Sequence, residues 1–187
     1  MISDNTTRLT FAAQVRLTGE GLVLREWTDA DLPVMAELFD DRDIAYWTPL
    51  ASPFDAAAAR AYLARARQAR ADGTGLRLAI TTDGALPLGE VLLFRKNADD
   101  RAVSLGYTVG SAHRGQRLGS RALRLLTDYA HHDLGLPRVT LGIATENAAS
   151  ISVARSAGYH PTDEPPLDVV TKGRPRAIRT WAHDCRD

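Results

Sequence analysis

One stretch decides the fold expected for this chain: residues 113–120, which read His113-Arg114-Gly115-Gln116-Arg117-Leu118-Gly119-Ser120. An alternating apolar strand, residues 102–109, runs into this basic turn, and an amphipathic helix follows the turn directly. The first amide N–H groups of a helix have no internal partner, and the helix macrodipole adds partial positive charge there. Strand, glycine turn and helix N-terminus together predict a binding site for a phosphorylated cofactor.

Glycine and arginine have complementary tasks in this turn. Gly115 and Gly119 let the backbone come close to phosphate groups, because they lack a side chain. Arg114 and Arg117 add full charges and forked hydrogen-bond donors. The turn has neither the Lys-Ser/Thr ending of a P-loop nor the G-x-G-x-x-G spacing, so neither of those nucleotide-phosphate loops is predicted. An ordinary strand-to-helix connection remains the alternative on these residues alone.

Composition and charge exclude several classes of protein. The 187 residues are 44% apolar and 25% charged, which is ordinary for one globular domain. Because 23 basic residues balance 23 acidic ones, the net charge argues weakly against a dedicated nucleic-acid binder, and a local basic patch remains an alternative. The single cysteine, Cys185, cannot form a disulfide within the chain. The sequence shows no secretory signal and no membrane-spanning apolar run, so we expect a cytoplasmic protein that binds no membrane.

The apolar pattern predicts one α+β domain with a central, mostly antiparallel sheet flanked by helices. This domain is expected to cover residues 21–187, after an N-terminal leader, residues 1–20, that holds at most one early strand. Short turns separate the three middle strands and favour an antiparallel meander. The expected strands are residues 22–25, 76–81, 88–94, 102–109, 139–143 and 174–181.

Two helix starts are expected in the first half of the chain. Thr28 is a suitable N-cap for the first helix. Ser52-Pro53 combines an N-cap with a proline at the first helical position, which predicts the start of a second helix. Residues 40–49 are expected to form a loop that carries Tyr46 and Trp47, two aromatic residues suited to the wall of an acceptor pocket.

A series of motifs runs along the second half of the chain: Gly106-Tyr107, Arg114-Gly115-Gln116, Leu134-Gly135-Leu136-Pro137-Arg138-Val139, Glu146-Asn147-Ala148-Ala149-Ser150 and Ala157-Gly158-Tyr159. In these motifs the chain resembles the acyl-CoA-binding half of the GNAT superfamily of N-acetyltransferases, in the branch that includes the ribosomal-protein N-terminal alanine acetyltransferases. The resemblance is tight over residues 103–159 and looser over residues 22–181.

The resemblance implies a GNAT-like twisted mixed sheet that splays open between the strands at residues 102–109 and 138–145. Acetyl-CoA would be the acyl donor, with its pantetheine in the opening and its pyrophosphate on the amides of residues 114–120. The cofactor-binding residues implied in this way are Tyr107, Thr108, Val109, Arg114, Gly115, Gln116, Arg117, Leu118, Gly119, Ser120, Asn147 and Ser150.

The implied reaction is direct attack of an amine on the thioester carbonyl. It requires a base that removes a proton from the amine, a hydrogen-bond donor for the oxyanion and a source of a proton for the departing thiolate. Glu90 is the predicted general base. It shares a strand face with Leu92 and Phe94, so we expect it to be half-buried, with a raised pKa. A rim carboxylate bonded to a neighbouring strand or an arginine is an equal alternative for Glu90. The backbone N–H of Val109 is the predicted oxyanion donor, and Ser150 is the predicted source or relay of the thiol proton.

The chain departs from the family pattern at several positions. Arg117 stands where the family turn usually has glycine. Ser104 and Arg121 stand where many relatives have glutamate, and Ala154 stands where many members have a tyrosine acid. Ala154 cannot donate a proton. These departures therefore affect the assignment of the catalytic residues more than the assignment of the cofactor.

Three functions are therefore carried forward. The first is acetyl transfer to a primary amine, which is either a protein N-terminus or a small molecule. The second is a non-catalytic module that binds or senses acyl-CoA. The third is transfer of another acyl group, such as succinyl. No metal site is predicted. The family often dimerises, which leaves a homodimer open.

Overall fold

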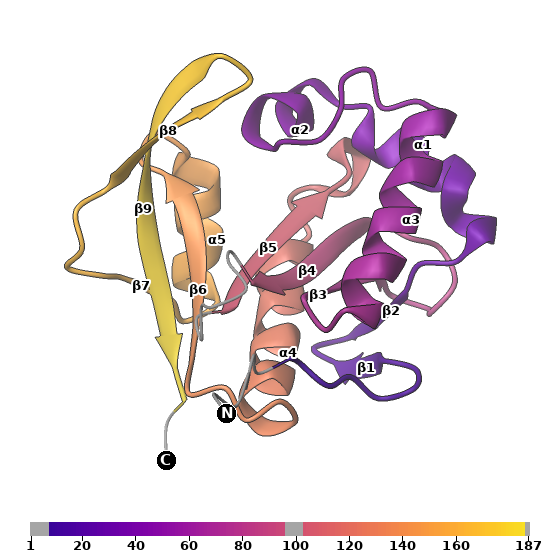
Figure 1. Ribbon diagram of the computed structural model, residues 1–187, viewed down its shortest axis with the longest axis horizontal. Coiled ribbons are helices and arrows are strands. Elements are labelled where there is room, and N and C mark those ends of the chain that lie inside the picture. The colour runs from indigo at the N-terminus through magenta and orange to yellow at the C-terminus, as the bar shows by residue number, and fades with distance from the viewer. Residues whose placement is uncertain (1–7, 96–102, 186–187) are drawn as a thin grey trace, which may run out of the picture.

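A nine-stranded sheet runs through the molecule in the computed structural model, which describes residues 8–95 and 103–185 (Figure 1). Its strands follow the order β1-β2-β3-β4-β5-β6-β9-β7, and β8 pairs with β9. The strands are β1 (Arg16–Gly19), β2 (Leu22–Glu26), β3 (Gly75–Thr81), β4 (Gly89–Arg95), β5 (Val103–Val109), β6 (Arg138–Ala144), β7 (His160–Pro161), β8 (Leu167–Thr171) and β9 (Arg174–Asp184).

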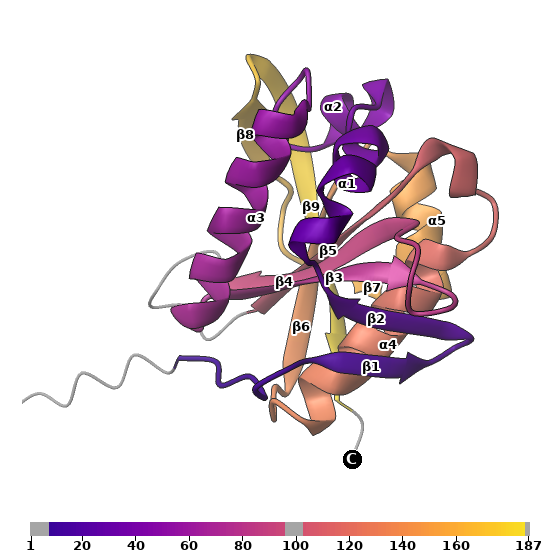
Figure 2. The same ribbon diagram turned by 90° about the vertical axis from the view of Figure 1, so that its right-hand side faces the viewer.

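Helices cover both faces of the sheet (Figures 1 and 2). On one face α1 and α3 enclose an apolar cluster that contains Met35, Phe39 and Phe54. On the other face α4 and α5 pack on a larger cluster that contains Leu123 and Leu126. The helices are α1 (Leu32–Phe39), α2 (Arg42–Trp47), α3 (Ala56–Ala71), α4 (Leu118–His132) and α5 (Ala148–Ser156), with short 3-10 turns η1 (Asp29–Asp31) and η2 (Ser111–His113).

The sheet opens between β5 and β6. Strands β1 to β5 form the expected antiparallel meander. In contrast, β5 and β6 are parallel, and within the described residues they pair only at Val103–Val139 and Ser104–Thr140. Beyond these two pairs the strands diverge toward the end of the sheet where α2 and the β8–β9 hairpin lie (Figure 1). The predicted α+β fold and its splayed sheet are confirmed.

Two expectations for the first helices were wrong. The segment expected to be a loop contains α2, because the Asp41 side chain caps it by accepting hydrogen bonds from the amides of Asp43 and Ile44, both at 3.0 Å. The next helix, α3, begins at Ala56 rather than at Ser52-Pro53. Its N-cap is Asp55, whose carboxylate accepts from the Ala58 amide at 2.8 Å.

The C-terminal part of the sheet is larger than expected. Strand β8 was not predicted, and it forms a hairpin with the first half of β9. The early strand β1 lies inside the expected leader, residues 1–20, and pairs along its whole length with β2. The turn expected at residues 96–101 lies outside the described residues. Among the described helices, none is both long and apolar enough to cross a membrane.

Candidate active site

The backbone of β5 presents hydrogen-bonding groups to the sheet opening. The Gly110 amide donates to the Leu88 carbonyl at 3.0 Å. Hydrogen-bonded and non-bonded pairs alternate in an antiparallel ladder, so the N–H and C=O of Val109 point away from β4 and toward the opening. In agreement, the Val109 carbonyl accepts from Arg114 Nε at 3.4 Å. Val109 therefore has the orientation required of the predicted oxyanion donor.

Two cavities meet at this opening. The larger, of about 430 Å³, extends along the turn to the N-terminus of α4. The smaller, of about 250 Å³, lies between β5, β6 and the β8–β9 hairpin. Because they share wall residues, the two cavities adjoin, and together they are called the channel below. The shared residues are Trp47, Thr48, Tyr107, Asn147 and Ser150.

The turn before α4 has the backbone shape of an anion cradle. Gly115 has a φ of +80°, and no atom lies within 4 Å of the position a Cβ would take. Arg117, the N-cap of α4, adopts the left-handed conformation with a φ of +57°. Both line the larger cavity, whereas Gln116 and Ser120 do not. Instead, Ser120 Oγ donates to the Arg117 carbonyl at 3.1 Å, which holds the start of the helix.

Packing requires Gly119 to lack a side chain, and Gly119 also lines the larger cavity. A Cβ at this position would lie 2.9 Å from the ring of Tyr107, so a side chain there would displace that ring. The Tyr107 hydroxyl donates to Ser150 Oγ at 3.2 Å. Burial raises the pKa of Tyr107, and the bond to Ser150 only partly opposes this, so the phenol keeps its proton.

The link between Tyr107 and Ser150 was missed by sequence reasoning, because it joins a strand to a helix 43 residues later. Asn147 is the N-cap of α5, since its Oδ1 accepts from the Ser150 amide at 3.0 Å. This bond uses the oxygen of the Asn147 side chain and leaves its NH₂ group on the channel wall.

Arg114 ties the turn to α2. Its guanidinium forms ion pairs with Asp43 at 2.7 Å and with Asp41 at 2.8 Å. Arg114 lines the larger cavity, yet its charge faces the acidic N-terminus of α2 as well as the predicted phosphate site. An anion bound in the turn would therefore compete with Asp41 and Asp43 for this guanidinium.

Glu90 lies much deeper than expected. Its residue is only 1% exposed, and it lines neither cavity. Trp27 Nε1 donates to one carboxylate oxygen at 2.9 Å, the Tyr62 hydroxyl donates to the other, and Arg77 lies 3.7 Å away. Burial raises the pKa of Glu90 to about 7, although the Arg77 charge and the two hydrogen bonds oppose the shift. The expectation of a half-buried residue facing the acceptor was wrong, because α1 and α3 cover this strand face.

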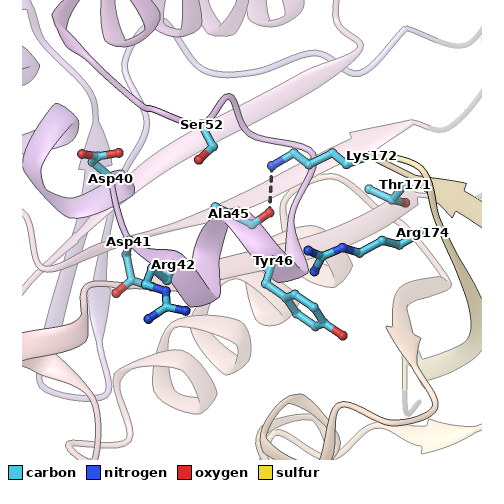
Figure 3. A pocket seen from close by; sticks show the side chains of 9 residues that line it. All are labelled: Asp40, Asp41, Arg42, Ala45, Tyr46, Ser52, Thr171, Lys172 and Arg174. Atoms are coloured by element: carbon cyan, nitrogen blue, oxygen red, sulfur yellow. Dashed lines mark hydrogen bonds between the residues drawn. The ribbon is translucent and has the colours of Figure 1, made fainter.

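Of the two aromatic residues predicted at the acceptor site, only Trp47 lines the channel. Tyr46 is 42% exposed and lines a third cavity, of about 510 Å³, between α2 and the β8–β9 hairpin (Figure 3). There the guanidinium of Arg174 lies 4.7 Å from the centre of the Tyr46 ring. Lys172 Nζ donates to the Ala45 carbonyl at 2.8 Å, which holds the hairpin against the end of α2.

The departures from the family pattern have structural explanations. Ala154 is fully buried in the larger core cluster, so it faces no cavity. Ser104 and Thr140 share a hydrogen bond of 3.0 Å where β5 still pairs with β6. Arg121 donates to the Glu20 carbonyl at 2.7 Å and so ties α4 to the β1–β2 turn.

Comparison with known proteins agrees with this geometry. Residues 21–160 match the family model described as an acetyltransferase (GNAT) domain. Probable N-acetyltransferase YjcK of Bacillus subtilis (strain 168) is 39% identical over 56 residues, so the match spans 30% of this chain and only 31% of that protein.

Two solved structures share the fold over most of this chain. Mycobacterium smegmatis RimJ in complex with CoA-disulfide is 20% identical, with 92% of this chain and 87% of that chain covered and a TM-score of 0.78. Spermidine N-acetyltransferase from Vibrio cholerae in complex with CoA and spermine is 17% identical, with 89% and 96% covered and a TM-score of 0.73. At such low identity this likeness concerns the fold.

Proposed function

The chain belongs to the acetyltransferase (GNAT) domain family, and from this premise we propose that it moves an acetyl group from acetyl-CoA to a primary amine by direct transfer. One observation carries the proposal. Among residues 8–95 and 103–185, β5 and β6 pair at only two positions before they diverge, and the resulting channel runs from the opening to the N-terminus of α4. A long, phosphate-bearing thioester fits a channel with a hydrogen-bonding strand edge at one end and helix amides at the other.

Three groups of channel residues suit three successive parts of the donor. The amides at the start of α4, the open backbone of Gly115 and the charge of Arg117 suit the pyrophosphate. The outward backbone groups of Tyr107 and Val109, with the neighbouring Thr108, suit the amides of the pantetheine arm. The NH₂ group of Asn147 suits a carbonyl on the same arm.

When bound, the donor supplies an activated acetyl carbonyl attached to sulfur. The Val109 N–H is the donor that stabilises negative charge on the carbonyl oxygen as the C–N bond forms. As the C–S bond breaks, Ser150 Oγ gives its proton to the sulfur while the Tyr107 hydroxyl donates a proton to Ser150 along their hydrogen bond, and water that has taken up the amine proton reprotonates Tyr107. This pair takes over the task of the tyrosine that many family members have at the position of Ala154.

The amine proton leaves to water in this proposal. Among the described residues, no aspartate or glutamate lines the smaller cavity. Both carboxylate oxygens of Glu90 are already engaged by Trp27 and Tyr62 on the covered face of the sheet. We therefore assign Glu90 a positioning role, in which it fixes the strands behind the channel, in place of the base role expected from the sequence.

Calorimetric titration with acetyl-CoA, CoA and succinyl-CoA tests the donor site without an acceptor. Micromolar acetyl-CoA binding followed by release of CoA on addition of amines is expected. Gly115→Asp should weaken this binding by more than tenfold, since it brings negative charge to the cradle. Gly135→Asp is the matched control, because Gly135 has a φ of +65° and equally open surroundings.

The outcomes separate the three functions. Acetyl-CoA binding without acetylation of any amine would favour the sensing module, and tighter binding and faster transfer of succinyl-CoA would favour another acyl group. No binding to any thioester would overturn the donor site. The acceptor class, protein N-terminus or small molecule, a cytoplasmic location, a homodimer and the 21–187 domain boundary are retained here as predictions. Light scattering during size-exclusion chromatography tests the dimer.

A further inference from the structure

Arg176 is a buried cation at the end of the channel that lies away from the turn before α4. It lies on β9, it is only 7% exposed, and it lines the smaller cavity. Its guanidinium lies 4.4 Å from the Tyr46 ring centre and 4.7 Å from the Trp47 ring centre. Nη2 donates to the Tyr46 carbonyl at the end of α2. These contacts hold the guanidinium rigidly without neutralising its charge.

The positive charge of Arg176 has no counter-charge in the described part of the chain. No carboxylate among residues 8–95 and 103–185 forms an ion pair with it, and its buried Nε has no hydrogen-bond partner there. Arg25 shows the contrast, since its partly sheltered guanidinium forms a forked pair with Asp31 at 2.8 Å. Burial of a charge without a partner is costly, so such a charge is expected to meet a partner from outside.

The rest of the smaller cavity is uncharged. Among its described wall residues Arg176 is the only one with a charge, and the walls include Leu105, Leu141, Ile143 and Ile178. The volume of about 250 Å³ suits a group the size of an amino acid. A cation in such surroundings attracts an anion strongly and disfavours a polycation, because the surrounding apolar walls screen charge poorly.

We propose that the acceptor is a small amine that carries a carboxylate, and that Arg176 binds this carboxylate. The proposal rests on the acetyl transfer proposed above and assigns the substrate class of the same site. A guanidinium suits a carboxylate because its planar N–H donors match the two oxygens. With the carboxylate fixed at Arg176, the amine of the same molecule lies in the part of the channel shared with Tyr107 and Ser150.

The test measures binding of matched pairs to the CoA-saturated protein by calorimetry. Each pair consists of an amino acid and its carboxamide: glycine and glycinamide, leucine and leucinamide, phenylalanine and phenylalaninamide. We expect at least one acid to bind roughly tenfold or more tightly than its amide. Comparison of 4-methylpentanoate with 4-methylpentanamide, neither of which has an amine, removes the effect of the amine pKa. O-Phosphoethanolamine shows whether the site prefers a phosphate to a carboxylate. Spermidine is expected to bind more weakly than the preferred acid.

Variants assign the preference to Arg176. Arg176→Met should abolish the difference between acid and amide, and Arg176→Lys should restore part of it. Arg174→Met is the matched control, because Arg174 also stacks on Tyr46 but lies outside the smaller cavity. It should keep the full preference. Unchanged acetyl-CoA affinity in each variant shows that the fold is intact, and the wild-type comparison stands even if Arg176→Met does not fold.

Other outcomes overturn the inference. Equal binding of acid and amide, no binding of either, stronger binding of spermidine or preference for the phosphate would each contradict the assignment of a carboxylate. In these cases acetyl-CoA still binds in the titration without acceptor, so the proposed function survives. If acetyl-CoA itself does not bind, the proposed function fails and this inference fails with it.

Discussion

Glu90 is the side chain whose charge should couple folding to pH. Burial raises its pKa from 4.5 to about 7, so between these values the folded protein retains a proton that the unfolded chain has released. The stabilisation is complete below pH 4.5 and is lost as the pH rises through 7. The expected loss is roughly 3 kcal/mol of unfolding free energy.

Glu90→Gln removes this titration and gives the first prediction. Relative to the wild type, the variant should gain stability from pH 5 to pH 8 by about that amount, as measured by urea denaturation at each pH. Because Glu90 lines neither cavity, the pH dependence of turnover should keep its shape. Loss of the acidic limb of the rate profile in the variant would return Glu90 to the role of general base.

Tyr107 and Ser150 carry the second prediction. Ser150→Ala should lower kcat by roughly a hundredfold and Tyr107→Phe by roughly tenfold, because the first removes the proton donor and the second only its relay. The KM for acetyl-CoA should change little, since the phenylalanine ring still packs against Gly119. Steady-state kinetics with a solvent deuterium isotope effect provide the measurement. A change confined to KM would reassign both residues to binding.

At the scale of the element, the start of α4 combines strain with function. Arg117 has a φ of +57°, and a left-handed conformation costs a non-glycine residue roughly 1–2 kcal/mol. Arg117→Gly should therefore stabilise the fold by roughly 0.5–1 kcal/mol, after the larger entropy of glycine in the unfolded chain is subtracted. The same change should weaken CoA binding several-fold, because it removes a positive charge from the phosphate site.

Arg117→Gly should therefore raise the free energy of unfolding and lower the affinity for CoA. Arg117→Lys keeps both the charge and the strain, so it should leave both stability and affinity near the wild-type values. Thermal denaturation and calorimetry on the three proteins give the comparison. If Arg117→Gly binds CoA as tightly as the wild type, the side chain points away from the phosphates and only the backbone forms the cradle.

The elements that sequence reasoning predicted correctly are those specified by their own residues. The apolar alternation along residues 102–109 is a local signal, and the strand that it predicts is confirmed as β5. Helix α2 is only six residues long, and its end is held by Lys172 and Arg176, which lie about 130 positions later. Such distant partners leave no local pattern.

The same reason explains the errors at the site. The depth of Glu90 depends on Trp27 and Tyr62, which come from other elements and close over its strand face. The Tyr107–Ser150 pair and the environment of Arg176 likewise form only when the sheet is assembled. The sequence shows which residue types are present. Which side chains become partners depends on how the strands and helices are arranged in the fold.

At the scale of the whole molecule, the donor would bridge two halves of the sheet that the backbone joins weakly. Strands β1 to β5 form one half, and β6 with β7 to β9 forms the other. In the part of the chain that the structure describes, the halves pair only at Val103 and Ser104 of β5. The outward amides of Tyr107 and Val109 should therefore exchange their hydrogens quickly in the free protein.

The last prediction is that acetyl-CoA, when it binds, forms hydrogen bonds with these outward backbone groups of β5. Hydrogen exchange at Tyr107 and Val109 should slow markedly with the ligand, whereas the Gly110 amide, already bonded to the Leu88 carbonyl, should change least. At about a hundred times the dissociation constant the ligand should also add roughly 2.7 kcal/mol to the unfolding free energy. Exchange measured by NMR distinguishes the two effects. Uniform slowing at all three amides would reflect this global stabilisation alone and would place the donor away from β5.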